Sequence, residues 1–341
     1  MGAEDRIVIA TRGSALALAQ ANRVLADCRA ALPRLVFELK IVKTTGDKLQ
    51  TASLAQEGKA LPKGLFTKEL EVALIKRRAD LAVHSLKDLP TELPAGLTLG
   101  AVGKRADVRD VLIYRSAAWL EAASREPSSG KSAPGLSTRR GFNPKLAVSD
   151  LPAGAVVATT STRRKAQLLV LNPALKTPDF RGNVLTRMQK LAERAELDAT
   201  ILALAGMSRL NFRVTADGAL EGDAVPDGLL ATILDTDIML PCVGQGAVGI
   251  EVREDDERIA GICARLNDHA TRQCVTAERA FLAAMGGGCQ SPVGAYAEAD
   301  GEQLRMKVIS FAHGPVRRAE GDRPLKEAAE LGRQLAEQLR V

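Results

Sequence analysis

Aromatic residues are scarce in this chain, which has one Trp, two Tyr and seven Phe among 341 residues. Proteins that bind single-stranded nucleic acid usually stack its bases on aromatic side chains. The sequence therefore offers little support for that activity. Apolar residues make up 46% of the chain and charged residues 26%, which is typical of a soluble globular protein.

Cysteine is also rare, and the five cysteines are an odd number without a C-x-x-C pair. This pattern argues against a disulfide framework and against a zinc site. We expect no metal ion and a reducing, cytoplasmic environment. The cysteines are Cys28, Cys242, Cys263, Cys274 and Cys289.

Long apolar runs are absent: no stretch reaches the roughly 18 residues of a membrane-spanning helix, and the first residues lack the pattern of a secretory signal. The net charge of +6 comes from 47 basic and 41 acidic residues, without a basic tail. We therefore expect no membrane partner, and only the distribution of the charges can indicate an anionic ligand.

The length predicts two or three domains. Strands are expected at 6–12, 35–44, 80–84 and 97–102, with helices at 14–32 and 67–78 between them. This alternation predicts an α/β domain with a mainly parallel sheet covered on both faces.

The same alternation resumes after residues 116–150, which read as a surface insertion rich in Ser, Gly and Pro. Residues 155–205 predict a second α/β domain, and 247–252 a strand that returns to the first sheet. From residue 267 the order changes to helix, glycine-rich loop, strands and helix. This part predicts a small α+β unit.

Cys289 follows Gly286, Gly287 and Gly288 at the end of a predicted helix. A lone cysteine is usually a small buried apolar residue. Three glycines, however, leave few side chains to bury the sulfur and give the loop a flexible backbone. The setting favours a thiol presented to a ligand, although the buried alternative stays open.

Asp88 lies just beyond the predicted strand 80–84, where α/β sheets present their ligand-binding groups. Beside Lys87, its carboxylate could stabilise a developing cation or transfer a proton. The alternative is a turn or helix cap before Pro90. His84 is expected in the core or in support of a neighbouring residue, because no other metal-binding side chain is near in the sequence.

Arginines recur at predicted strand ends and helix starts. Such positions favour anions through free N–H groups, and a guanidinium adds a clamp for carboxylate or phosphate. One such arginine is usually solvent-facing, but several predict a polyanionic ligand. They are Arg12, Arg163, Arg164, Arg181, Arg187 and Arg209.

Lys59 and Lys63 precede Gly64 and Phe66, and this loop either folds over the ligand or carries ordinary surface charges. Both interpretations stay open.

Taken together, these residues resemble the hydroxymethylbilane synthase (porphobilinogen deaminase) family over nearly the whole chain outside 116–150. The order of the matching segments is more specific than any one of them. They are IATRGSALALAQ from Ile9, KGLFTKELE from Lys63, ADLAVHSLKDLP from Ala79, TTSTRRKAQL from Thr159, FRGNVLTRMQKL from Phe180, ILALAGMSRL from Ile201, LPCVGQGAVGIEVR from Leu240 and VTAERAFLAAMGGGCQSPVGAYAE from Val275.

The resemblance implies an α/β protein of three domains: two like the halves of periplasmic binding proteins around a cleft, and a small α+β C-terminal domain. Their expected limits are 1–108 with 244–265, 109–240, and 266–341. It also implies a cytoplasmic monomer.

The implied activity joins four porphobilinogen molecules into linear hydroxymethylbilane with release of ammonia. A dipyrromethane cofactor would be held by a thioether on Cys289. Asp88, with Lys87 and Arg12, would form the catalytic group and stabilise the cation that forms as ammonia leaves. The acetate and propionate groups of cofactor and product would be bound by Arg12, Ser14, Arg163, Arg164, Arg181, Arg187 and Arg209. Further cleft or loop positions are Gln20, Lys63, Phe66, Ser85, Lys87 and Ser161, with Lys59 in a mobile loop.

The chain departs from the family pattern in two places. Ala60, Leu61 and Pro62 stand where a glycine pair is common. Near the paired arginines, Gly, Ser and Leu are replaced by Ala158, Thr160 and Thr162.

Two other functions remain as alternatives at this point. One is a non-catalytic binding protein or sensor for a small dianion, which would leave Cys289 without a role. The other is a nucleic-acid-binding protein, which rests on the net charge and the arginines alone.

Overall fold

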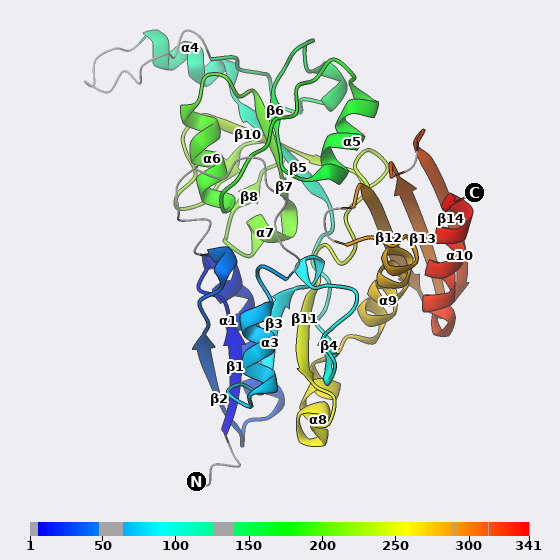
Figure 1. Ribbon diagram of the computed structural model, residues 1–341. Helices are drawn as coiled ribbons and strands as arrows, with labels where there is room; N and C mark the ends of the chain where they lie inside the picture. Colours follow the sequence, from blue (N-terminus) through cyan, green and yellow to red (C-terminus); the bar gives the residue numbers. More distant parts are fainter. Residues whose placement is uncertain (1–5, 48–63, 126–138, 289–290, 313, 341) are drawn as a thin grey trace. The chain divides into compact units, whose positions relative to one another are not determined.

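The computed structural model describes residues 6–47, 64–125, 139–288, 291–312 and 314–340 (Figure 1). The chain forms two compact units. Unit 1 comprises residues 1–106 and 242–341, and unit 2 comprises residues 107–241. The α/β class is confirmed, because each unit combines its own sheets with helices. The division into three domains stays a prediction.

The first sheet of unit 1 has the order β2-β1-β3-β11-β4. Its strands are β1 (Arg6–Thr11), β2 (Val36–Ile41), β3 (Leu81–Ser85), β4 (Leu97–Val102) and β11 (Val248–Arg253). β1 is parallel to β2 and β3, whereas β11 is antiparallel to β3 and β4. The return of the chain to this sheet is confirmed. The expectation of a mainly parallel sheet is confirmed, because β1, β2, β3 and β4 run in one direction and only the returning strand β11 runs in the opposite one.

Helices cover both faces of this sheet, as expected. They are α1 (Ala15–Ala31), α3 (Lys68–Ile75) and α8 (Glu257–Leu266). Successive side chains of a strand point to opposite faces of the sheet. In β1, Ile7 and Ile9 therefore pack with α1 and α8 on one face, whereas Ala10 packs with α3 on the other.

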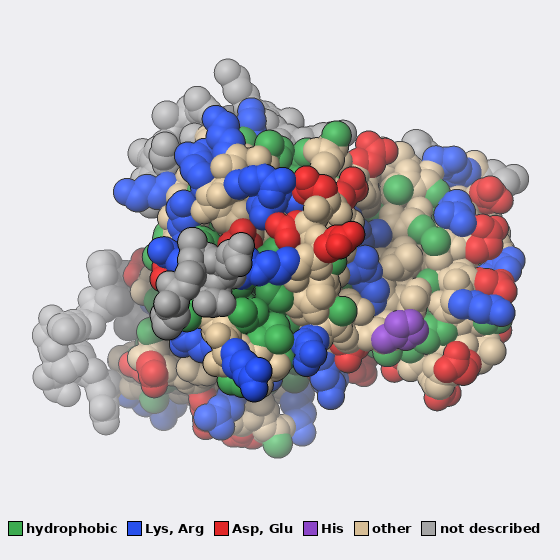
Figure 2. Space-filling model, turned by 90° about the horizontal axis from the view of Figure 1, so that it is seen from below, with side chains coloured by type: hydrophobic (Ala, Val, Ile, Leu, Met, Phe, Trp, Pro, Cys, Tyr) green, Lys and Arg blue, Asp and Glu red, His purple; other side chains and the backbone are tan. Residues whose placement is uncertain are grey.

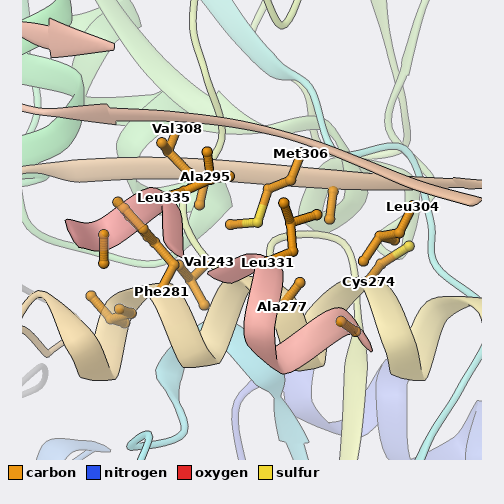
Figure 3. Close-up of a cluster of buried hydrophobic side chains, with 14 of the residues drawn as sticks. Val243, Cys274, Ala277, Phe281, Ala295, Leu304, Met306, Val308, Leu331 and Leu335 are labelled. Carbon is orange, nitrogen blue, oxygen red and sulfur yellow. The ribbon is translucent and has the colours of Figure 1, made fainter. Parts of the chain in front are cut away.

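The C-terminal part of unit 1 is an antiparallel sheet packed against two helices (Figure 3). Its elements are α9 (His269–Ala284), β12 (Val293–Asp300), β13 (Gln303–Ser310), β14 (Arg317–Pro324), the 3-10 turn η5 (Leu325–Glu327) and α10 (Ala328–Arg340). Phe281, Met306 and Leu335 fill the space between the layers. Gly332 allows the two helices to approach closely, since a Cβ there would lie 2.1 Å from the Ala277 carbonyl oxygen.

Unit 2 is built on a mixed sheet with the order β10-β5-β7-β6, beside a small β8-β9 pair. Its strands are β5 (Asp110–Arg115), β6 (Val157–Ala158), β7 (Ala199–Ala203), β8 (Arg213–Val214), β9 (Leu220–Glu221) and β10 (Leu229–Leu234). Its helices are α4 (Ala117–Arg125), the 3-10 turn η4 (Val148–Asp150), α5 (Thr162–Leu171), α6 (Val184–Glu193) and α7 (Leu204–Ser208). β5 and β10 were not predicted from the sequence.

The segment 116–150 is not purely a surface insertion. Leu146 and Val148 are buried in a core cluster of unit 2, and the Leu146 N–H donates to the Tyr114 hydroxyl at 3.1 Å. Leu120 of α4 is also buried. The expectation of a surface segment is wrong for these residues, because apolar side chains scattered among polar ones still reach the core. Residues 126–138 lie outside the described ranges.

A buried ion pair joins the two parts of unit 1. Arg105, just after β4, donates to Glu278 of α9 at 2.6 and 3.0 Å. The same carboxylate accepts from the N–H groups of Gly244 at 2.7 Å and Ala297 at 2.9 Å. Glu278 is fully buried. One side chain therefore connects the loop before β11, α9 and β12.

No helix in the described part of the chain is long and apolar enough to cross a membrane.

We predict that Glu278→Gln will lower the unfolding free energy by about 3–5 kcal/mol, because it leaves the buried Arg105 without a counter-charge. Chemical denaturation measures this change. Glu298→Gln, at an exposed position of β12, is the matched control and should change stability little. Equal effects of the two substitutions would contradict the assigned role of the pair.

Candidate active site

Several of the predicted site residues of unit 1 follow the ends of two neighbouring strands. β1 and β3 are parallel, with Ala10 opposite Ala82, so their carboxyl ends meet at one edge of the sheet. Arg12 comes directly after β1, and Lys87 and Asp88 follow β3. This edge is where open α/β sheets bind ligands.

Arg12 is held between an acidic and an aromatic side chain. Its Nη2 lies 2.5 Å from Asp47 Oδ1, and its guanidinium carbon lies 4.1 Å from the centre of the Phe66 ring. Burial alone would raise the pKa of Asp47, but hydrogen bonds from Arg12 and Thr44 outweigh it and lower that pKa. Arg12 and Phe66, both predicted site residues, thus lie in contact. Asp47 was missed, because the partners are 35 residues apart.

Three further predicted residues have defined local roles. Ser14 caps α1, accepting from the Ala17 N–H at 3.3 Å. Gln20 is buried, and its Nε2 lies 2.9 Å from Ser85 Oγ. This contact ties α1 to the end of β3. His84 is also buried and lies 2.9 Å from Glu251, which confirms the prediction of a core histidine.

Asp88 ends the 3-10 turn η2 (Leu86–Asp88). Its side chain is exposed, whereas the flanking Leu86 and Leu89 are buried and fix the turn. Within the described ranges, neither Asp88 nor Lys87 forms a side-chain hydrogen bond or ion pair. The Asp88 carboxylate is therefore available to a ligand.

In unit 2 too, predicted site residues follow the carboxyl ends of two neighbouring parallel strands. β6 and β7 are parallel, with Val157 opposite Ala199. Ser161, after β6, caps α5 by accepting from the Arg164 N–H at 3.4 Å. Arg209 follows β7 at the end of α7.

Arg163 and Arg164 are buried and bind a common carboxylate. Arg163 Nη2 lies 2.8 Å from Asp110 Oδ2, and Arg164 Nη2 lies 2.7 Å from Asp110 Oδ1. They also donate to the carbonyl oxygens of Leu240 and Ile201. Burial opposes the ionisation of Asp110, but the two arginines prevail and hold its pKa far below the ordinary value. Much of the hydrogen-bonding capacity of this arginine pair is thus used inside unit 2.

Arg187 has a different environment. Its Nε is buried, and no group in the described part of the chain accepts from it. Burial and the nearby Arg164 lower the pKa of Arg187 to about 10. Burial also lowers the pKa of Arg209, and Arg181 is exposed. A buried guanidinium nitrogen that has no acceptor favours an anionic ligand.

The residues that depart from the family pattern fit their surroundings. Ala158 is fully buried in the core of unit 2, and Thr160 Oγ1 donates to the Phe180 carbonyl oxygen at 3.2 Å. Thr162 is exposed at the start of α5.

Cys289, Lys59 and Lys63 lie outside the described residues, as do Ala60, Leu61 and Pro62. In the described ranges, no cluster of three or more His, Cys, Asp or Glu side chains could hold a metal ion.

Arginines near the carboxyl edges of the sheets, as found in each unit, are typical of α/β proteins that bind small polyanions. The comparisons with known proteins define the family. Residues 7–261 match the model of the porphobilinogen deaminase dipyrromethane cofactor binding domain, and residues 272–340 match that of the porphobilinogen deaminase C-terminal domain. The chain belongs to the porphobilinogen deaminase family.

Curated relatives agree with this assignment. The chain is 39% identical to porphobilinogen deaminase of Paracoccus denitrificans, over 99% of this chain and 94% of that one. It is 42% identical to the enzyme of Desulforudis audaxviator, over 98% and 94% of the two chains. Among solved structures, the methionine binding protein MetQ has a TM-score of 0.39 at 12% identity, over 77% of this chain and 90% of MetQ.

The family consists of transferases, also called hydroxymethylbilane synthases, that act in porphyrin and heme biosynthesis with a dipyrromethane cofactor. The alternative of a non-catalytic binding protein is therefore wrong.

The Asp110 cluster predicts a specific pH dependence. Because the pKa of Asp110 is lower in the folded protein than its ordinary value of 3.8, its contribution to stability is present above about pH 4 and lost as the pH falls further. Asp110→Asn should therefore lower the unfolding free energy at pH 7 by about 3–5 kcal/mol and weaken the loss of stability in acid.

Chemical denaturation at pH 7 and at several values below pH 4 tests both statements. Asp235→Asn, at a carboxylate with 75% of its side chain exposed, is the control and should leave stability within about 1 kcal/mol. An unchanged acid profile in Asp110→Asn would show that this carboxylate is not the group responsible.

Proposed function

We propose that the chain condenses four porphobilinogen molecules stepwise, with Asp88 as the catalytic carboxylate and Cys289 as the attachment site of the dipyrromethane. The observation that carries the proposal is the exposed Asp88 carboxylate, which has no partner among the described residues and lies at the carboxyl edge of the first sheet. The match to the cofactor binding domain supports the same assignment.

Each unit has residues that suit the binding of carboxylates. The buried, uncompensated Nε of Arg187 is the clearest indication, because a carboxylate would provide the acceptor that it lacks. When bound, the dipyrromethane supplies the pyrrole carbon to which the first substrate is joined. We assign the binding of carboxylates to Arg12, Ser14, Arg163, Arg164, Arg181, Arg187 and Arg209.

Asp88 opposes the positive charge that develops as the substrate loses ammonia. A fixed carboxylate acts most strongly when no protein cation already neutralises it, and Asp88 meets this condition in the described residues. Its neighbour Lys87 is half-buried and supplies a cation for a substrate carboxylate. Gln20 and Ser85 hold the end of β3 in place beneath them.

The arginines differ in how much of their hydrogen-bonding capacity remains for a ligand. Arg12 keeps one face on Phe66 and one edge on Asp47, so a ligand carboxylate competes with Asp47 for it. Arg163 and Arg164 share Asp110, and we propose that they contribute mainly by positioning the start of α5. Arg187 is the strongest candidate for direct contact in unit 2.

We further propose that the protein is a cytoplasmic monomer with three domains. Neither a membrane nor a nucleic acid is needed for this function. On the face in view in Figure 2, Lys and Arg side chains are interspersed with Asp and Glu.

The covalent attachment can be tested by intact-mass measurement. Protein purified from cells that make porphobilinogen should carry the added mass of one dipyrrole, and Cys289→Ser should carry none. Cys242→Ser is the control and should keep the addition, since Cys242 contacts Gln245 within its own loop. Unmodified wild-type protein would refute the attachment site.

The role of Asp88 is tested by Asp88→Asn. The substitution keeps the size of the side chain and removes its charge, so the fold should persist while kcat falls by about 10²-fold or more. Formation of hydroxymethylbilane from porphobilinogen measures the rate. Asp150→Asn, at another exposed carboxylate, is the control. Wild-type turnover in Asp88→Asn would remove Asp88 from the mechanism.

A further inference from the structure

Arg279 of α9 binds the segment that follows Asp88. Its Nη2 donates to the carbonyl oxygens of Pro90 at 2.6 Å and Thr91 at 3.1 Å, and its Nη1 donates to that of Leu89 at 3.2 Å. No other donor in the described part of the chain reaches these three oxygens. One guanidinium therefore fixes the path of the backbone immediately after the proposed catalytic carboxylate.

Apolar packing beside Arg279 holds the turn that comes before its hydrogen bonds. Val275 lies one turn before Arg279 on the same face of α9, and it packs with Leu86 and Leu89 in a buried cluster. Apolar contacts thus hold both sides of the turn that carries Asp88, and Arg279 holds the chain beyond it. Burial, and secondarily Arg272, lowers the pKa of Arg279 to about 10, so it stays protonated at neutral pH.

The position of Arg279 on α9 connects two parts of the proposed site. Its neighbour Glu278 anchors the helix to Arg105, Gly244 and Ala297. Along the chain, α9 leads through Met285 and Gly286 to Cys289. The helix that precedes the proposed attachment cysteine is therefore fastened to the backbone that presents Asp88.

We propose that Arg279 is a positioning residue that sets the Asp88 carboxylate relative to α9 and so determines the rate of the chemical step. The inference rests on the proposed role of Asp88. Three charge-assisted hydrogen bonds to consecutive carbonyls restrict the backbone more than one contact would. A small displacement of a catalytic group can lower the rate by up to about a hundredfold.

The test compares Arg279→Gln, Arg279→Lys and Arg272→Gln in the holoenzyme. Arg272 lies on the same helix, and its side chain makes no hydrogen bond with the described residues, which makes it a matched control. Kinetics with porphobilinogen give kcat and KM, intact mass gives the cofactor load, and thermal unfolding gives stability.

We expect Arg279→Gln to keep its cofactor load and to lose about ten- to a hundredfold in kcat with KM within about twofold of the wild type. Arg279→Lys should recover part of kcat, because an ammonium still donates to the carbonyls. Arg272→Gln should behave like the wild type. A merely structural role predicts neither the separation of kcat from KM nor the rescue by lysine.

The proposal is overturned if Arg279→Gln matches Arg272→Gln in kcat, if lysine gives no rescue, or if the loss follows the cofactor load or the melting temperature. Should the glutamine variant not fold, Arg279→Lys against Arg272→Gln decides by the same criteria. Asp88→Asn, measured in parallel, distinguishes the proposed role of Asp88 from that of Arg279. Full activity of Asp88→Asn refutes the role of Asp88. An inactive Asp88→Asn together with a fully active Arg279→Gln refutes only the positioning role of Arg279.

Discussion

The contact between Arg105 and Glu278 is the constraint on which the rest of unit 1 depends. A fully buried carboxylate is costly unless all its acceptor sites are used, and Glu278 uses them on three separate segments of the chain. It fixes α9 to the end of the first sheet and orders the loop before β11. Arg279, the next residue, holds the segment after Asp88 from the helix that Glu278 helps to position.

The arginines of the candidate site show how differently one type of side chain is used. Arg163 and Arg164 are neutralised by the buried Asp110, and Arg12 is partly neutralised by Asp47. Arg187 has a buried nitrogen without an acceptor among the described residues. A position near the sheet edge thus brings an arginine to the candidate site. The carboxylates of the protein itself determine how much of the charge of that arginine is left for a ligand.

The sequence predicted those features that depend on local chemistry. The predicted helix 14–32 matches α1, and the apolar run after residue 247 located the returning strand β11. It could not reveal Asp47 or Asp110 as partners, because these pairs join residues 35 and 54 positions apart and carry no local pattern. β5 and β10 were missed as well, although both are apolar runs: β5 stands directly before the segment that was interpreted as an insertion, and no helix follows β10 before β11.

The order of the strands also has a consequence for the biosynthesis of the protein. β11 lies between β3 and β4 in the first sheet, yet it is encoded after the whole of unit 2. As the chain leaves the ribosome from its N-terminus, β3 and β4 therefore lack the strand that separates them until residues 107–241 have emerged. All of unit 2 is therefore present in the nascent chain before the first sheet of unit 1 can be completed. Unit 1 cannot be the first of the two units to reach its final form.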